Sequence, residues 1–175
     1  MKRLLLIGTN HTYQYGAGNQ WLKGSPCEPE DEQAFRMKLT AVAVEHRVGC
    51  IAEEMNEEGL ADAKQSKSVP QIVAGSLGLP HIFCEASRKK RADLGVREEA
   101  EIRCWGNLYE KSDAEIDAQV KESFRRREAY WLERVEALGT WPVLFICGAK
   151  HVVSFPALLC ENGVECEVLH ASWKP

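Results

Sequence analysis

The sequence predicts an α/β fold: a mostly parallel central sheet of about five strands with helices on both faces, in a single domain spanning residues 1–175. Two observations predict it. Short apolar runs alternate with segments of helical periodicity, as in strand–helix–strand units. The runs are apolar throughout, which is typical of parallel strands covered on both faces. A chain of 175 residues can bury roughly two thirds of its surface, enough for one core.

The strands are expected at the short, continuous apolar runs. They are predicted at residues 4–7, 50–52, 81–84, 143–146 and 164–169. The first run ends at Gly8, and the second is followed directly by Glu53 and Glu54. Polar residues therefore follow the strands at the edge of the sheet where their carboxyl ends meet.

Helices are predicted where apolar residues recur every three or four positions. They are expected at residues 30–46, 71–77, 113–138 and 155–160. The acidic segment 30–32 suits a helix N-terminus, and Gly139 ends the longest helix after about seven turns. The polar and aromatic segment 9–29 is predicted to be a functional loop, and the segment 88–103 a loop with a short helix.

Composition argues against several classes of protein. Lys and Arg number 22 against 26 Asp and Glu, a formal net charge of −4, so no basic face for nucleic acid is indicated. The seven cysteines are odd in number and form no C-x-x-C pair, which argues against a disulfide framework or a zinc ribbon. No apolar run is long enough for a membrane span or a signal peptide. We expect a cytoplasmic protein that contacts neither nucleic acid nor membrane.

Two strand ends carry the same pattern. The first predicted strand is followed by Gly8-Thr9-Asn10-His11 and the fourth by Gly148-Ala149-Lys150-His151. Glycine lets the backbone turn tightly at the sheet edge, and the third residue after it projects into the crevice there. If the two strands are neighbours, His11 and His151 face one pocket. A single G-x-x-H would mean little, but two copies on equally apolar strands predict a shared site.

Two carboxylates lie at the equivalent end of the second strand, Glu53 and Glu54. Consecutive strand residues point to opposite faces, so at most one of them is expected to join the crevice. The sequence does not choose between them. Either is a candidate metal ligand or general base, the alternative being an ordinary solvated strand end. Glu85, after the third strand, is a further candidate of the same kind.

The longest helix carries charges on its apolar stripe. Between Phe124 and Trp131 the stripe should continue, but these positions hold Arg127 and Glu128. A charge on a buried helix face is costly unless it is paired. Either Arg127 extends to solvent, or it binds an anionic group or a carboxylate, with Glu128 as its partner or as another pocket carboxylate.

The segment 9–29 is rich in aromatic residues. Tyr13, Tyr15 and Trp21 are candidates for an aromatic lid over His11, the alternative being that they simply pack the segment down.

This layout resembles the TraB and Tiki superfamily, which also includes the erythromycin esterases and the ChaN-like haem-binding proteins. The G-x-x-H signatures of that group match Gly8 to His11 and Gly148 to His151. Its acidic motif would fall on Glu53 or Glu54, and its arginine motif on Arg127. Ser154 stands where a glycine often follows the second histidine in those relatives. The resemblance implies metal-dependent peptidase, ester hydrolase or ligand-binding function.

The function predicted is hydrolysis of an ester or amide bond in a small-molecule or peptide substrate. The candidate catalytic residues are His11, Glu53, Glu54, Arg127 and His151. Of these, the two histidines and two glutamates could hold a divalent metal, Mn, Co or Zn, that activates water. In a metal-free variant, one histidine takes a proton from water or substrate. The alternative is a non-catalytic module that binds haem or another small ligand in the same crevice.

Overall fold

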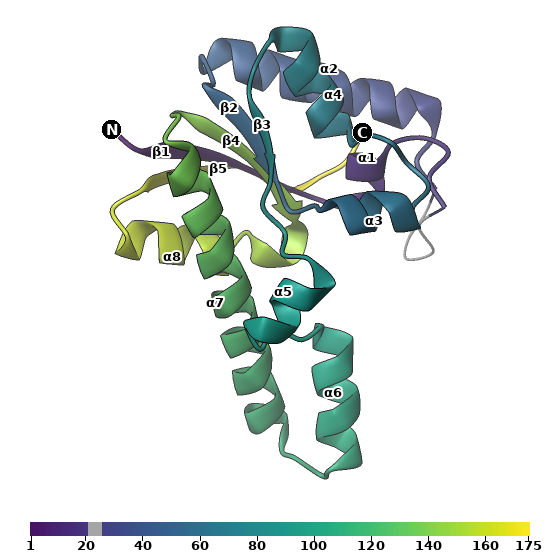
Figure 1. Ribbon diagram of the computed structural model, residues 1–175, viewed down its shortest axis with the longest axis vertical. Coiled ribbons are helices and arrows are strands. Elements are labelled where there is room, and N and C mark those ends of the chain that lie inside the picture. Colours follow the sequence, from purple (N-terminus) through teal and green to yellow (C-terminus); the bar gives the residue numbers. More distant parts are fainter. Residues whose placement is uncertain (21–25) are drawn as a thin grey trace.

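The computed structural model describes residues 1–20 and 26–175, and it contains a five-stranded sheet in the order β3-β2-β4-β1-β5 (Figure 1). Every pair of neighbouring strands is parallel. The strands are β1 (Arg3–Thr9), β2 (Cys50–Glu53), β3 (His81–Phe83), β4 (Val143–Gly148) and β5 (Glu165–Trp173). The predicted α/β fold is therefore confirmed, and the last strand runs four residues further than expected.

Eight α-helices are described. They are α1 (His11–Tyr15), α2 (Pro29–Glu45), α3 (Glu57–Asp62), α4 (Val69–Leu77), α5 (Arg88–Asp93), α6 (Glu99–Leu108), α7 (Asp113–Leu138) and α8 (Ser154–Glu161), with a 3₁₀ turn, η1 (Ala149–His151), after β4. Two expectations need correction. The segment 9–29 is not only loop, because Asn10 caps the short helix α1 at the N–H of Thr12. The segment 88–103 contains α5 and the start of α6.

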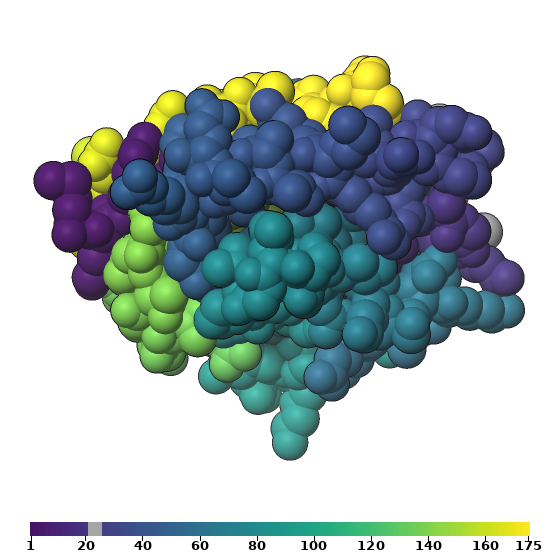
Figure 2. All heavy atoms as spheres, turned by 90° about the horizontal axis from the view of Figure 1, so that it is seen from above, coloured from purple at the N-terminus to yellow at the C-terminus, as the bar shows by residue number. Residues whose placement is uncertain are grey.

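The helices cover the sheet on two faces. On one face α2 and α4 pack against alternate strand residues such as Leu5 and Ile7. On the other face α7 and α8 pack against the intervening residues, such as Leu4 and Leu6. Seen from above, α2 and α4 form one broad cover and β5 lies along one side (Figure 2). Both faces of the central strands are therefore apolar, as the continuous apolar runs predict.

The helix α7 is longer than the sheet it covers. Its first half extends away from the sheet beside α6, and the two helices form an arm (Figure 1). A small separate core, made of Ile102, Ile116 and Val120 with Phe124 against it, holds the arm together. The other end of α7 packs on the sheet through Trp131. This helix therefore passes the carboxyl edge of the sheet, and its middle residues lie at that edge.

Among the described residues, no helix combines the length and the apolar character needed to cross a membrane.

Candidate functional site

A cavity of about 660 Å³ lies at the carboxyl edge of the sheet. Strands β1 and β4 are neighbours, with Thr9 opposite Gly148, and β2 pairs with the other side of β4. The three strand ends thus meet at one place. Residues at or just after these strand ends line the cavity, together with Glu85 after β3 and residues of α3, α5, α6 and α7. They include His11, Glu54, Arg127, Gly148 and His151.

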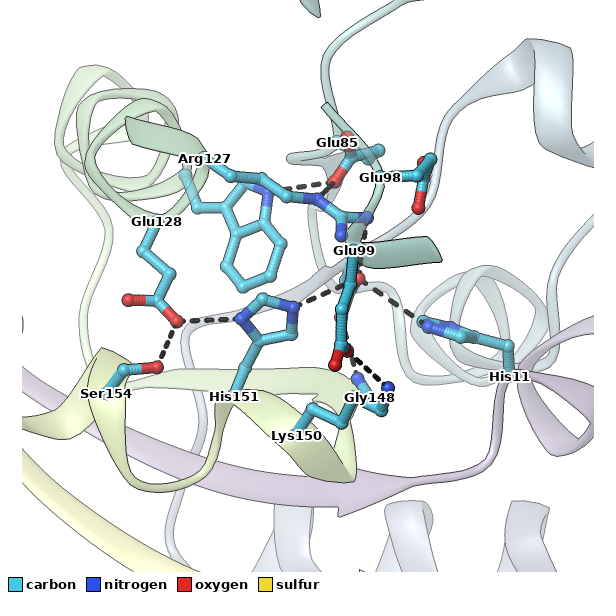
Figure 3. Close-up of polar contacts among 12 residues, drawn as sticks. His11, Glu85, Glu98, Glu99, Arg127, Glu128, Gly148, Lys150, His151 and Ser154 are labelled. Carbon is cyan, nitrogen blue, oxygen red and sulfur yellow. Dashed lines mark hydrogen bonds and ion pairs between the residues drawn. The ribbon is translucent and has the colours of Figure 1, made fainter. Parts of the chain in front are cut away.

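The two histidines of the repeated strand end meet there. The Nε2 atoms of His11 and His151 lie 3.5 and 3.7 Å from the same oxygen, Oε1 of Glu54. Figure 3 shows the two rings pointing toward each other from the ends of β1 and β4. The structure therefore brings together two residues 140 positions apart in the chain.

Glu54, which directly follows β2, is the carboxylate at the centre of the site. Its side chain is almost fully buried. Oε1 accepts from Nη2 of Arg127 at 2.7 Å, and Oε2 accepts from the backbone N–H of Gly148 at 2.7 Å. Burial disfavours the ionised carboxylate, but the charges of Arg127, His151 and His11 and the Gly148 hydrogen bond outweigh it and lower the pKa of Glu54 to about 2. Glu54 is therefore an anion at neutral pH.

Arg127 is fixed between two carboxylates. Its Nε donates to Oε2 of Glu85 at 2.7 Å, and Trp131 Nε1 donates to the same oxygen at 3.1 Å. Burial opposes the charge on Arg127, but Glu54 and Glu85 outweigh it and raise its pKa. Burial raises the pKa of Glu85 despite Arg127. The charge on the buried stripe of α7 is thus explained: Arg127 binds carboxylates of the site and does not extend to solvent.

His151 is held by the residue next to Arg127. Its Nδ1 lies 2.7 Å from Oε1 of Glu128, and Ser154 Oγ donates to the same oxygen at 2.5 Å (Figure 3). The ring lies between Phe124 and Trp131, with centroid distances of 4.4 and 4.7 Å. An ionised carboxylate only accepts, so Nδ1 carries a proton and Nε2 faces Glu54. Glu128 is therefore neither a partner of Arg127 nor a cavity carboxylate, but the residue that orients His151.

Glu53 lies on the opposite face of β2, and its assignment as a direct ligand or base is corrected. The side chain is fully buried and accepts from Ser68 Oγ, from His81 Nε2 at 2.8 Å and from Gln14 Nε2 at 3.1 Å. It does not line the cavity. The alternation of strand side chains sends Glu54 toward α7 and Glu53 toward α4.

Sequence reasoning missed Gln14. Its Oε1 lies 2.7 Å from Nδ1 of His11, one turn away on α1. The signal was the spacing H-x-x-Q, which places both side chains on one helix face. It becomes readable only once residues 11–15 are recognised as a helix.

The aromatic lid is only partly present. Tyr15 lines the cavity but is buried. Tyr13 packs edge-on against Trp173, with centroids 5.3 Å apart, in the core below the other sheet face. Trp21 lies outside the described residues. Packing, the simpler interpretation, thus accounts for Tyr13.

The helix α6 forms an outer wall of the cavity. Its first residue, Glu99, contacts Lys150 Nζ at 2.5 Å and Arg103 Nε at 2.8 Å. The hydrogen bond with Lys150, followed by that with Arg103, lowers the pKa of Glu99. The contact joins α6 to η1 next to His151 (Figure 3). Segment 88–103, expected to be mainly loop, therefore helps to enclose the site.

The residues of the cavity do not fit the expected metal centre. Among the described residues, no group of three or more His, Cys, Asp and Glu side chains is arranged to hold a metal ion. Arg127 argues against the metal centre on separate grounds, because its guanidinium is bonded to the Glu54 oxygen that both imidazoles face. A divalent cation at that oxygen would be repelled by a buried positive charge already there. Glu53, the other expected carboxylate ligand, is on the far side of β2.

Comparisons of the chain with protein-family models, with curated proteins and with solved structures find no significant match. The resemblance to the TraB and Tiki superfamily stays a prediction.

Proposed function

We propose that this protein is a hydrolase that cleaves an ester or amide bond by general acid–base catalysis with His11 and His151. One observation carries the proposal: two imidazole Nε2 atoms converge on one buried, ionised carboxylate in a cavity, beside a buried arginine. Two histidines with a purely structural role would not need to face the same buried carboxylate. Paired acid–base groups in a cleft are typical of hydrolytic sites.

His11 is the general base in this proposal. Its side chain is 33% exposed, against 4% for His151, so water reaches it more easily. Its Nε2 faces the cavity and takes a proton from the water that attacks the substrate carbonyl. General acid–base catalysis of this kind contributes about 10²- to 10⁴-fold.

His151 is the general acid. Glu128 holds the ring in place at Nδ1 and stabilises the imidazolium when Nε2 is protonated, as a carboxylate does in a catalytic triad. His151 begins the reaction as the imidazolium, and its Nε2 proton passes to the leaving oxygen or nitrogen. The proton that His11 takes from the attacking water is then lost to solvent and His151 is reprotonated from solvent, so both histidines regain their starting states. The rings of Phe124 and Trp131 keep the imidazole from rotating away.

Arg127 and Glu54 set the electrostatic field. The guanidinium stabilises negative charge that develops on the carbonyl oxygen as water attacks. Glu54 holds Arg127 in place and lies beside both imidazoles, so a positive charge gained by His11 in the reaction is stabilised at once. Because these groups are already fixed, they need not reorganise during the reaction.

Turnover of chromogenic esters and of peptide amides tests the proposal. We expect His11→Asn and His151→Asn each to lower kcat/KM by about 100-fold or more. His46→Asn, at the end of α2, is the matched control and should leave it unchanged. Substrates turned over equally by wild type and both site variants would contradict the proposal. Haem binding with no hydrolysis of any substrate class would favour the non-catalytic module instead.

A further inference from the structure

A chain of hydrogen bonds runs from His11 away from the cavity and through the sheet edge. Nδ1 of His11 lies 2.7 Å from Oε1 of Gln14, and Nε2 of Gln14 donates to Oε2 of Glu53 at 3.1 Å. Gln14 and Glu53 are both fully buried. None of the catalytic steps above uses either side chain, so this buried polar pair needs a reason.

Glu53 decides which way the amide of Gln14 points. Its carboxylate is met by three donors: Ser68 Oγ, His81 Nε2 and Gln14 Nε2. An ionised carboxylate can only accept hydrogen bonds. Gln14 must therefore turn its NH₂ group toward Glu53, because its carbonyl oxygen there would face another acceptor in a buried site.

The orientation of Gln14 in turn decides the tautomer of His11. With its NH₂ on Glu53, Gln14 presents its oxygen to His11, and an amide oxygen only accepts. The proton of the neutral imidazole must then reside on Nδ1. The lone pair is on Nε2, which faces the cavity and lies 3.5 Å from Oε1 of Glu54, beyond the usual length of an N–H···O hydrogen bond. In water the neutral ring prefers the opposite tautomer, with the proton on Nε2. That form could not accept a proton from a water in the cavity.

We infer that Glu53 and Gln14 are positioning residues that hold His11 in the one neutral tautomer able to act as a base toward the cavity. The inference rests on the proposed function for its catalytic consequence. His151 is oriented in the same sense, but by a carboxylate in direct contact, Glu128. His11 is instead linked to Glu53 through a neutral amide, so its Nδ1 has no anionic group in direct contact. The base and the acid of the site thus have Nδ1 partners of different charge, while Nε2 of both rings lies near Glu54.

The tautomer of His11 can be measured directly. Long-range ¹H–¹⁵N spectra of the ¹⁵N-histidine-labelled 175-residue chain, at a pH where the ring is neutral, distinguish a protonated ring nitrogen from one with a lone pair. His11→Asn identifies the His11 signals. In the wild type we expect the proton on Nδ1. Glu53→Gln lets Gln14 turn over, and Gln14→Leu removes the acceptor, so both should give a substantial Nε2–H population.

Two further variants separate positioning from a general structural role. In Gln14→Glu, a protonated carboxyl donates to Glu53 and its carbonyl oxygen still accepts from His11, so the wild-type tautomer should be retained. Tyr13→Ala loosens α1 from Phe35 and Trp173 without touching the hydrogen-bond chain, so it should lower stability and leave the tautomer unchanged. On an active substrate, Gln14→Leu should lower kcat/KM about 10- to 100-fold, and Gln14→Glu should restore part of it.

The inference is overturned if wild-type His11 carries its proton on Nε2. It is also overturned if Glu53→Gln and Gln14→Leu fold and leave the Nδ1–H tautomer dominant. The wild-type measurement alone decides the first point, even where a variant fails to fold. If the tautomer behaves as expected but no substrate is hydrolysed, the proposed function fails and the positioning by Glu53 and Gln14 stands.

Discussion

Gly148 lies so close to His11 that a side chain at position 148 would displace the imidazole ring. A Cβ added to Gly148 would lie 2.9 Å from Nε2 of His11 and 3.3 Å from Oε2 of Glu54. The φ of Gly148 is −62°, so the contact, and not the backbone conformation, explains the glycine. The glycine of the second G-x-x-H pattern therefore makes room for the histidine of the first.

This contact predicts the effect of Gly148→Ala. The variant should fold, because alanine adopts this backbone without strain, but His11 and Glu54 must shift by a few tenths of an ångström. Small displacements of catalytic groups are costly, and we expect kcat/KM to fall about 10-fold or more with little change in thermal stability. Gly75→Ala is the control: its Cβ would meet nothing within 4 Å, and alanine there should leave kcat/KM unchanged. Equal activity of Gly148→Ala and wild type would contradict the geometry.

The contact between His151 and Glu128 predicts a second effect. Glu128→Gln replaces an obligate acceptor with an amide that can also donate, so the ring of His151 is no longer held in one tautomer. We expect kcat to fall about 10²- to 10⁴-fold, as when the orienting carboxylate of a triad is lost. Ser154→Ala removes the other partner of Glu128 and leaves the contact to His151 in place, so its effect should be far smaller. Comparable losses in the two variants would assign Glu128 a structural role only.

Much of this arrangement could be predicted from the sequence, and the remainder depends on long-range packing. Continuous apolar runs identify the strands, because parallel strands are buried on both faces. The same property leaves open which of Glu53 and Glu54 faces α7. Alternation places the two side chains on opposite faces of the sheet, but because both faces are apolar the sequence does not say which residue is on which face. Helix α1 has only five residues and is held by the cap at Asn10, so no periodicity reveals it or Gln14. The partners of Arg127 come from strands far away in sequence.

The position of Arg127 predicts a large effect on stability. Arg127→Met leaves Glu54 and Glu85 buried without their shared cation. Breaking a buried ion pair from one side costs about 3–5 kcal/mol, and we expect a loss of that size in urea unfolding. Glu54→Gln in the Arg127→Met background should restore part of the loss, because it removes one of the two uncompensated charges. If the single variant costs less than about 1 kcal/mol, the pair contributes no more than a surface salt bridge.

The same residue decides the expected response to metal removal. Arg127 already supplies the positive charge beside Glu54, so we expect hydrolysis to survive dialysis against a chelator, and purified protein to contain far less than one equivalent of Mn, Co or Zn. Metal analysis and activity before and after dialysis measure both. Activity lost on dialysis and restored by one of these cations would support the metal-dependent mechanism that the sequence predicts. In that case His11→Asn and His151→Asn should also lower the metal content.

The pH dependence of stability distinguishes Glu54 from Glu85. The folded-state pKa of Glu54 is lowered to about 2 from an ordinary 4.5, so its ionisation stabilises the fold fully above about pH 4.5, and this contribution is lost as the pH falls toward 2. The stability difference between wild type and Glu54→Gln should therefore shrink as the pH drops from 6 to 3 in urea titrations. The pKa of Glu85 is raised, so its ionisation destabilises the fold. The stability of Glu85→Gln relative to the wild type should therefore increase as the pH rises through and above 4.5. A pH-independent difference for Glu54→Gln would mean that its carboxylate is not stabilised by Arg127 and the two imidazoles.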